Sequence, residues 1–578
     1  MQKIKVLMEA AKLSLLSRPR LFIVSQIISI IYGLSYGLTT LLIQKVIQSV
    51  VANLGFRIQA IYVSSLVLVI FTGFFCNHLL NQVNAHLASH VEVKANQKLF
   101  SKLLKHEPIS FERADFNDRL ELAFGITQPI GYVGLIIVGL FTTNLLAIIS
   151  SAAVLYRSNP LLAGILLLCF IPNLYQFFRK AESRDEIKEK LAELRRETQV
   201  ASEMLIGVEF NKETRALGAS GFLEANFRNS LKNEQALDVL NQQQNQRYDL
   251  QSKVLSLIAD GAAIGLCIFL LYASRIDVAA FTAALAAIAS FSFVIEQFFF
   301  NDLQTLIDFY GDLAIYQEFL DEQVETRKSQ KLLGPPEIEF KNVSFAYPGQ
   351  EEAVLKNVSI DIKSGERIAL VGFNGAGKST FVKLATGLFM PGEGEVLIDG
   401  KSSRDWKIFG EFGAVFQDYS VYKLSLAENI SIARGVLEPN ARLEELMPET
   451  YIQDFAGQGL EGGSLIGREF KGTELSGGWQ QTIAILRAVN SRKNYYIFDE
   501  ASSAIDPQRE EKLIKLMLNT SEGKTAIFVT HRMALCQFVD RIILLEDGRI
   551  IEQGAFKDLY LEGSRFYQYY HEQEKWFH

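Results

Sequence analysis

The segment VGFNGAGKST, residues 371–380, decides the fold of the second half of this chain. It contains the pattern G-x-x-x-x-G-K-S, with a run typical of a β-strand before it and a run typical of a helix after it. Glycines let the backbone wrap around phosphate groups, Lys378 can reach the terminal phosphates, and the Ser379 hydroxyl can bind Mg²⁺. Because strand, loop and helix follow in the right order, the segment predicts a phosphate-binding loop in an α/β domain.

An acidic pair follows further along the chain. The apolar run in YYIFDE, residues 495–500, predicts a strand that ends at Asp499 and Glu500. Ligands of open α/β sheets bind at the carboxyl ends of the strands. Asp499 can hold a metal ion, directly or through water, and Glu500 can polarise an attacking water molecule, as phosphoryl transfer requires. An isolated acidic pair is more often a surface turn, but after a phosphate-binding loop it indicates catalysis.

A second turn suited to anions lies in TELSGGWQQTIAILRA, residues 473–488. Ser476, Gly477 and Gly478 open a segment whose later apolar residues have helical spacing. The start of a helix exposes backbone N–H groups, here beside a hydroxyl, and such a turn can hold an anion. The pattern alone does not say which anion this second turn serves.

Length and composition describe the rest of the chain. The 578 residues are too many for one ordinary core, so two or more domains are expected. Of these residues 49% are hydrophobic and 21% are charged, which is too apolar for a wholly soluble protein. The net charge of −7 argues against a basic nucleic-acid surface. Four widely spaced cysteines are interpreted as packing residues, not as disulfides or a zinc site: Cys76, Cys169, Cys267 and Cys536.

The apolar residues of the first half form runs long enough to cross a lipid bilayer as helices. We expect six membrane spans, near residues 21–43, 60–80, 130–156, 160–178, 254–273 and 278–300. The basic, weakly amphipathic segment before the first span is expected on the membrane surface. Basic residues are concentrated at the amino terminus and in the loops 81–129 and 179–253, so both termini and both long loops are expected in the cytoplasm. These loops are expected to form helices that run on past the membrane.

A change of pattern marks the domain boundary. A charged stretch ends in Pro335 and Pro336 and indicates a linker. After it, short β-type runs such as RIALVG and EVLIDG alternate with helical stretches. We therefore expect a transmembrane domain over residues 1–320, a linker over 321–336 and a nucleotide-binding domain over 337–578.

Taken in order, these motifs resemble those of the ATP-binding cassette (ABC) transporters, in their exporter-type half-transporter form. The resemblance covers essentially the whole chain. It implies an all-α domain of six membrane helices, of the type IV exporter kind, followed by a P-loop α/β ATPase domain. It implies ATP and Mg²⁺ as cofactors, with metal contacts from Ser379, Gln417 and Asp499. The loop residues that it places on ATP are Gly372, Asn374, Gly375, Gly377, Lys378, Ser379 and Thr380.

Four further residues have roles implied only by the resemblance. Tyr347 in SFAYP matches the aromatic residue that stacks on adenine, and Gln417 in AVFQD matches the glutamine that senses the metal and the membrane domain. Asp506, which ends SAID, matches the loop that crosses between subunits. His531 in VTHR matches the histidine that contacts the γ-phosphate. Alone, each of these residues would more often be structural.

The resemblance also gives the second anion-binding turn a use. In cassette dimers the signature turn, here Ser476 to Gly478, closes on the ATP held by the P-loop of the other subunit. The family usually has Gln after the two glycines, whereas this chain has Trp479 followed by Gln480. Gln481 and Arg487 keep their expected places. The resemblance therefore implies a second half-transporter as partner, either another copy of this chain or a related subunit.

The implied function is ATP-driven export, by a dimer, of an amphipathic or hydrophobic substrate such as a peptide, a drug-like compound or a lipid. The expected location is the plasma (inner) membrane of a bacterium. Two other functions stay open: an importer on the exporter fold, and an ATP-gated channel or regulator. Intact Glu500 and His531 favour turnover over switching. Residues 106–118 and 207–219 resemble coupling helices that dock on the ATPase domain, although ordinary solvated helix turns are an alternative.

Asp260 and Glu296 are acids inside the fifth and sixth expected spans. Acids within a membrane are costly and usually face a cavity or a partner. They are candidates to receive a cationic or amphipathic substrate. Alternatively, each pairs with a basic residue or with His78 for structural reasons.

Overall fold

The computed structural model describes residues 2–161, 164, 171, 174–175, 185–324, 326–435, 441–467, 472–501 and 507–574. The chain divides into two compact units. We call Met1–Leu104 with Asp118–Glu322 the membrane unit, and Lys105–Asn117 with Gln323–His578 the ATPase unit.

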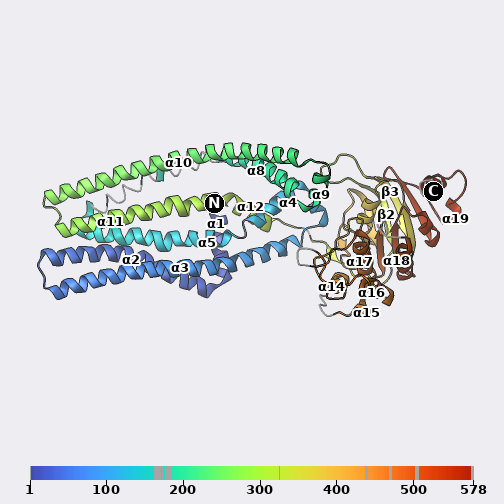
Figure 1. The fold of residues 1–578 in the computed structure, drawn as a ribbon, viewed down its shortest axis with the longest axis horizontal. Coiled ribbons are helices and arrows are strands. Elements are labelled where there is room, and N and C mark those ends of the chain that lie inside the picture. Colours follow the sequence, from blue (N-terminus) through green and yellow to red (C-terminus); the bar gives the residue numbers. More distant parts are fainter. Residues whose placement is uncertain are drawn as a thin grey trace. The chain divides into compact units, whose positions relative to one another are not determined.

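The membrane unit is helical throughout its described part (Figure 1). Its elements are α1 (Gln2–Ser17), α2 (Pro19–Val51), α3 (Phe56–Leu103), α4 (Ala114–Gly125), α5 (Ile130–Gly139), η2 (Leu140–Leu145), α6 (Leu146–Ser158), α8 (Asp185–Ile206), α9 (Val208–Ala216), α10 (Ser220–Tyr272), α11 (Val278–Glu296), η3 (Gln297–Leu303) and α12 (Gln304–Asp321). Of these, η2 and η3 are single stretches of π-helix.

Five of the described helices are long and apolar enough to cross a membrane. They are Pro19–Val51, Phe56–Leu103, Ile130–Arg157, Ser220–Tyr272 and Val278–Asp321. They contain five of the six expected spans, and the fourth, residues 160–178, lies mostly outside the described residues. Helices α3 and α10 run far beyond the apolar runs, which confirms the prediction that the long loops continue as helices (Figure 1).

Small residues let these helices approach closely. Ser29, Gly33 and Gly37 recur at every fourth position of α2 and are buried. A Cβ atom added at Gly33 would lie 2.7 Å from the carbonyl oxygen of Thr143, and Ser29 bonds to the Thr142 hydroxyl at 2.9 Å. Because apolar side chains gain little from leaving lipid for another helix, close backbone approach and interhelical hydrogen bonds carry such packing.

The basic amino-terminal segment forms helix α1, and its expected place on the membrane surface stays a prediction. Its buried residues Val6, Ala10 and Leu13 lie on one face. At Gly134 in α5, an added Cβ atom would lie 2.7 Å from the carbonyl oxygen of Ala10. This face of α1 therefore packs inside the membrane unit.

The ATPase unit contains two main sheets and a set of helices. Its elements are η1 (Pro108–Glu112), β1 (Lys328–Ser329), β2 (Ile338–Phe345), β3 (Leu355–Ile362), β4 (Arg367–Val371), α13 (Lys378–Ala385), β5 (Glu393–Ile398), β6 (Lys401–Ser402), β7 (Trp406–Lys407), β8 (Gly413–Val415), α14 (Leu426–Ser431), η4 (Ile432–Arg434), α15 (Leu443–Leu446), α16 (Glu449–Ala456), α17 (Gly477–Asn490), β9 (Tyr495–Asp499), α18 (Pro507–Thr520), β10 (Thr525–Val529), η6 (Met533–Phe538), β11 (Arg541–Glu546), β12 (Arg549–Gly554), α19 (Phe556–Leu559) and α20 (Arg565–Glu574).

The larger sheet has the strand order β12-β11-β4-β10-β9-β8, with β11 to β8 parallel and β12 antiparallel. The smaller sheet has the order β3-β2-β5-β6 and is antiparallel. The central strands β4, β9 and β10 are almost wholly buried, as expected for parallel strands covered on both faces. The predicted α/β domain is confirmed.

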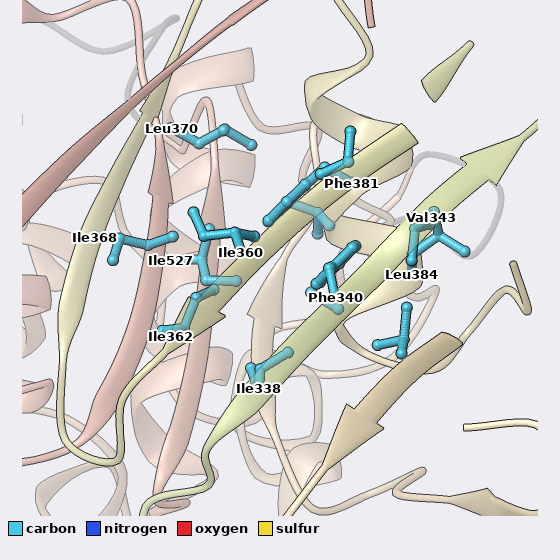
Figure 2. Close-up of a cluster of buried hydrophobic side chains, with 14 of the residues drawn as sticks. Ile338, Phe340, Val343, Ile360, Ile362, Ile368, Leu370, Phe381, Leu384 and Ile527 are labelled. Atoms are coloured by element: carbon cyan, nitrogen blue, oxygen red, sulfur yellow. The ribbon is translucent and has the colours of Figure 1, made fainter. Parts of the chain in front are cut away.

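A continuous apolar core joins the two sheets around helix α13. Figure 2 shows side chains of β2, β3, β4, β10 and α13 converging on this core. Phe340 of β2 and Phe381 of α13 stack with ring centroids 4.5 Å apart. Because α13 follows the phosphate-binding loop directly, this packing fixes the position of the loop.

Residues 105–117 belong to the ATPase unit although they connect α3 to α4. Glu107 forms a buried ion pair with Arg327, and Arg327 also donates to the carbonyl oxygens of Gly387 and Ser403 at 2.8 and 2.7 Å. Ile109 packs on the apolar core. These contacts lie within the ATPase unit, and the role of residues 106–118 as a coupling helix stays a prediction. The other predicted coupling stretch forms α9 in the membrane unit.

Candidate nucleotide site

Four neighbouring parallel strands bring the predicted site residues together. In the order β4, β10, β9 and β8, their carboxyl ends lead to the phosphate-binding loop, His531, the pair Asp499–Glu500, and Gln417. These residues are far apart in the sequence but share one edge of the sheet because parallel strands end on the same side. This is where open α/β sheets bind ligands.

The phosphate-binding loop has a backbone that demands glycine at two points. Gly372 has φ of 153°, and a Cβ atom there would lie 2.1 Å from the carbonyl oxygen of Leu545. Gly377 has φ of 98°, in the left-handed region, and immediately precedes α13. The loop therefore ends at a helix amino terminus, whose N–H groups and dipole favour phosphate. Asn374 and Gly375 are exposed at the tip of the loop.

Lys378 lies under this loop. Its side chain is 6% exposed, and its ammonium group donates to the carbonyl oxygens of Gly372 and Phe373 at 2.9 and 3.0 Å. Burial lowers the pKa of Lys378, while the nearby charges of Glu500 and Asp499 oppose that shift. The ammonium group thus holds the loop closed and is positioned for phosphate oxygens.

Asp499 is the most buried acid of the site, at 2% exposed. Burial raises its pKa to about 6, and a hydrogen bond from Ser379 and the charge of Lys378 oppose that shift. Among the described residues, Oδ1 of Asp499 is buried without a hydrogen-bond partner. A carboxylate oxygen with unused lone pairs beside a serine hydroxyl is a donor set that fits Mg²⁺.

Glu500 is held by contacts at both ends. It has φ of 49°, uncommon for a residue other than glycine. The side chain of Gln481 donates to its carbonyl oxygen at 3.1 Å, and its own N–H donates to Val529 at 3.0 Å. The carboxylate accepts from Gln417 at 3.1 Å and lies 3.0 Å from Nε2 of His531. A constrained backbone of this kind is frequent at functional sites, where surrounding contacts hold it.

Burial, reinforced by the charge of Lys378, lowers the pKa of His531, and Glu500 opposes that shift. A pKa below 6.5 leaves His531 neutral near pH 7, and a hydrogen bond from its ring to the side chain of Glu500 places the proton on Nε2. This proton can point to Glu500 or to a phosphate oxygen that approaches the same position.

Tyr569 is a residue of the site that the sequence analysis missed. Its hydroxyl donates to the carbonyl oxygen of Gly372 at 2.9 Å and lies 3.4 Å from Nδ1 of His531. Its ring, 1% exposed, packs edge to face on Phe373, with centroids 5.0 Å apart. Helix α20 carries Tyr569 and is anchored by Arg565, which donates to Glu546 at 3.1 Å. No local motif in the sequence marks this tyrosine, because only the fold brings α20 to the loop.

Tyr347 lies beside α13. Its hydroxyl is 3.3 Å from Oγ1 of Thr380, and its ring packs edge to face on Phe345 and Phe389. The ammonium group of Lys383 lies 5.5 Å from the centre of the same ring. Tyr347 is therefore near the nucleotide loop, and its stacking on adenine stays a prediction.

The signature turn is built differently. Ser476 precedes the first residue of α17, and its side chain makes no capping bond to that helix. Ser476 and Gly477 are exposed, and the carbonyl oxygen of Gly477 accepts from the Tyr419 hydroxyl at 3.1 Å. In the described part of the chain, no hydrogen bond joins residues 476–478 to the phosphate-binding loop. Ser476 and Gly477 are therefore accessible from solvent.

Trp479, which stands where the family usually has Gln directly after the signature turn, is buried. It is 7% exposed, its ring packs on Phe455 with centroids 4.8 Å apart, and Arg509 lies 3.8 Å above it. Trp479 is therefore a core residue, and Ser476 and Gly477 before it remain exposed. Arg487, on the same helix, donates to the carbonyl oxygens of Asn429 and Ser420 at 2.7 Å each.

Three further predicted residues remain: Asp260, Glu296 and Asp506. Asp506 lies outside the described residues. In the membrane unit, Asp260 accepts from Ser292 at 2.9 Å, and Glu296 pairs with Lys253 at 3.1 Å, with both members of the pair exposed. Each acid has a protein partner, as the structural alternative expects, and their role in substrate binding stays a prediction.

The three described cysteines, Cys76, Cys267 and Cys536, are free and buried, which confirms their interpretation as packing residues. Cys169 lies outside the described residues.

Comparison with known proteins supports the assignment made from the motifs. Residues 355–503 match the ABC transporter family. The chain is 27% identical over 516 residues to the subtilin transport ATP-binding protein SpaT of Bacillus subtilis, a match that covers 86% of this chain and 83% of SpaT.

Other relatives match over the ATPase part alone. The leukotoxin translocation ATP-binding protein LktB of Mannheimia haemolytica is 36% identical over 258 residues, covering 43% of this chain and 36% of LktB. The alpha-hemolysin translocation ATP-binding protein HlyB of Escherichia coli is 36% identical over 240 residues, covering 40% of this chain and 33% of HlyB. These matches thus span about a third of the length of either relative.

The fold has a counterpart among solved structures. A bacterial Atm1-family ABC exporter with ATP bound superposes with a TM-score of 0.81 at 20% sequence identity. The match covers 96% of this chain and 99% of that exporter chain. At this identity the match establishes the exporter fold across both units.

Proposed function

Since the chain belongs to the ABC transporter family, in its exporter-type half-transporter form, we propose that two such chains use ATP hydrolysis to export a peptide across the plasma membrane of a bacterium. The observation that carries the proposal is the cluster of Lys378, Glu500 and His531 at the end of the parallel sheet. An intact acid beside a neutral histidine and a phosphate-binding lysine suits turnover better than a switch that only binds ATP.

Each residue of the cluster has a proposed task in hydrolysis. Lys378 neutralises the charge of the terminal phosphates, and the N–H groups of Gly375 and Gly377 bind phosphate oxygens. Glu500 orients and polarises the attacking water, and His531 donates from Nε2 to the γ-phosphate. In the structure Glu500 accepts hydrogen bonds from both His531 and Gln417, and these two bonds leave lone pairs on the carboxylate for the attacking water.

Ser379 and Asp499, with Gln417 nearby, would hold Mg²⁺. The free Oδ1 of Asp499 supports this assignment. When bound, the ion neutralises charge on the β- and γ-phosphates. The raised pKa of Asp499 means that the site loses metal affinity as the pH falls toward 6, because protonation removes the ligand.

The proposal also includes a partner chain, with which each ATP site is shared. Members of this family generally act as dimers, and the exposed signature turn supports a site shared between two chains. We propose that Ser476, Gly477 and Gly478 bind the ATP of the partner, with Asp506 at the same boundary. The chain carries a complete set of motifs, so a homodimer is the simplest assembly. Particle mass and ATPase activity of the chain expressed alone test it, and an inactive monomer would exclude the homodimer.

A peptide is the proposed substrate because the relatives named for subtilin, leukotoxin and hemolysin transport all have peptide or protein cargo. SpaT matters most of these, since it matches this chain across both units. The proposed topology places both termini and the ATPase unit in the cytoplasm, as the distribution of basic residues indicates.

Transport with defined sidedness tests the function. Inverted membrane vesicles that contain the chain should accumulate a fluorescent amphipathic peptide when ATP is added outside. Vesicles with Glu500→Gln should not accumulate it. Peptide loss from preloaded inverted vesicles would instead indicate import, and ATP-dependent leakage in both directions would indicate a gated channel.

A further inference from the structure

The membrane unit contains a cavity, lined by both polar and apolar side chains, that none of the motifs accounts for. Its volume is about 450 Å³, within the usual range for small-ligand sites. Helices α2, α3, α5 and α11 line it, together with the π-helical stretches η2 and η3. Polar side chains are unusual in such a unit, because an intramembrane polar group is costly unless it has a function or a partner.

Asp302 is the only acid that lines this cavity among the described residues. It lies on η3, and it accepts from Asn144 on η2 at 2.7 Å and from Gln297 at 3.3 Å. A π-helical stretch within an α-helix is rare and is frequently found at functional sites. Here two such stretches place one carboxylate at the wall of one cavity.

The wall beside Asp302 is rich in amides. Asn77, Asn81 and Asn84 stand at positions i, i+4 and i+7 of α3 and all line the cavity. An amide side chain both donates and accepts, so this row can bond to the peptide groups of an extended ligand. Tyr32 and Tyr36, whose hydroxyls are 2.9 Å apart, add aromatic surface to the same wall.

We infer that this cavity binds a cationic segment of the transported peptide, with Asp302 receiving its ammonium or guanidinium group and the α3 asparagines its backbone amides. The inference rests on the proposed function, which it narrows to peptides that carry a lysine or arginine side chain or a free amino terminus. A carboxylate with two oxygens offers about four lone-pair directions, of which two amide donors use two. The aromatic rings nearby favour the same cation.

A structural role for the same residues makes a different prediction. Hydrogen bonds between helices hold membrane bundles together, and the bond from Asn144 to Asp302 joins η2 to η3. If this were its whole purpose, loss of the Asp302 charge would lower thermal stability and weaken every ligand to the same extent.

Direct binding separates these readings without requiring turnover. The probes are two fluorescent synthetic peptides of one amphipathic sequence, the first with free lysines and the second with every lysine acetylated. Their affinity for the full-length protein in nanodiscs is measured by anisotropy, alongside its melting temperature. Asp277→Asn is the matched control, because Asp277 accepts from the N–H of Ala280 at the start of α11, a bond that asparagine can also make, and does not line the cavity.

We expect Asp302→Asn to lower the affinity for the lysine peptide roughly tenfold or more, because a partly desolvated charge contact is lost. Binding of the acetylated peptide to Asp302→Asn, and binding of either peptide to the Asp277→Asn control, should each change less than about twofold. Asn81→Leu should lower the affinity for both peptides alike. If Asp302→Asn does not fold, this variant still tests whether the α3 asparagines bind the peptide. Three results would overturn the inference. They are equal losses of affinity for both peptides in Asp302→Asn, unchanged affinity in both Asp302→Asn and Asn81→Leu, and equal affinity of the wild type for both peptides.

The same sample distinguishes failure of the inference from failure of the proposed function. Wild-type protein that hydrolyses ATP and transports a peptide but binds lysine and acetyl-lysine forms equally would refute the cationic site alone. Protein that binds the lysine peptide selectively yet shows no ATP-dependent transport would refute the proposed function and leave the site standing.

Discussion

The phosphate-binding loop and the signature turn both lie at helix starts suited to anions. Side chains of the same chain surround the loop, whereas the turn is exposed. Around the loop, Lys378 and Tyr569 bond to its carbonyl oxygens, and Glu500 and His531 contact each other. Around the signature turn, Ser476 leaves its own helix uncapped and Gly477 is exposed.

This difference supports the proposal that the signature turn meets nucleotide held by another chain. A loop that binds nucleotide within one chain can be supported from all sides by that chain. A turn that must meet the nucleotide of another chain has to remain exposed until the two chains associate. The contrast accounts for Trp479, whose large ring is buried and leaves Gly477 exposed.

The largest expected effect comes from Glu500→Gln, which alters the loop side of the comparison. The amide keeps the volume of the side chain but cannot polarise water as a carboxylate does. We expect ATP turnover to fall by roughly 100-fold or more, while ATP binding changes little. Steady-state ATPase assays and nucleotide binding measure the two quantities, and turnover at the wild-type rate would remove Glu500 from its assigned role.

Gly477→Asp tests the signature side. A Cβ atom at Gly477 meets nothing within 4 Å, so the variant should fold normally. Its carboxylate would repel the phosphates of a partner's ATP, and we expect turnover to fall roughly tenfold to 100-fold with normal ATP binding to the P-loop.

Gly463→Asp is the matched control for that variant, because Gly463 is exposed and equally open in the same unit. It should retain nearly full turnover. Full activity in Gly477→Asp, or equal losses in both variants, would show that the signature turn meets no phosphate.

Asp499→Asn tests the ionisation of Asp499 beside the phosphate-binding loop, through the pH dependence of stability. Burial raises the pKa of Asp499 to about 6, so folding disfavours its charged form. The neutral carboxyl group of Asp499 therefore stabilises the folded state. This contribution is fully present below the unfolded pKa of 3.8 and is lost as the pH rises through about 6. Asparagine does not titrate, so the ligand-free variant should be more stable than wild type at pH 8, by up to about 3 kcal/mol.

Thermal melts at pH 5 and pH 8 without Mg²⁺ measure this difference, which should shrink at the lower pH. Both melts need the same detergent or nanodisc and no nucleotide. A variant that is less stable than wild type at pH 8 would mean that Asp499 is stabilised in its charged form.

Tyr569→Phe has the smallest expected effect. The change removes the hydroxyl that bonds to Gly372 and lies near His531, but it keeps the ring on Phe373. One hydrogen bond of about 1 kcal/mol corresponds to a roughly fivefold loss of turnover. The pH profile of turnover should shift as well, because His531 loses a neighbour of Nδ1, whereas a purely structural tyrosine would alter stability and leave the profile unchanged.

The loop side was far more predictable from sequence than the membrane side. Lys378, Asp499 and Glu500 could be found because a local pattern fixes their chemistry, and parallel strands then bring them to one edge of a sheet. Tyr569 could not be found, since its contact with Gly372 spans almost 200 residues and depends on how α20 docks. Asp302 was missed for a related reason: it lies just past the apolar run that ended the sixth expected span, on a π-helical turn that composition does not reveal.

Asp260 and Glu296 show the limit of reading acids one by one. Both were selected because they interrupt apolar runs, but their bonds to Ser292 and Lys253 depend on neighbouring turns and helices. A sequence shows that an acid is present in a span, whereas only the helix packing shows whether it already has a partner.

The central claim is that each ATP site takes its P-loop from one chain and its signature turn from the other. Co-assembly of Lys378→Ala with Gly477→Asp tests it most directly. Each variant alone has two defective sites, but a mixed dimer has one site with both defects and one intact site. The account predicts that the mixture recovers roughly a quarter of wild-type ATPase activity, because half of randomly assorted symmetric dimers are mixed. Activity in the mixture no higher than in either variant alone would contradict it.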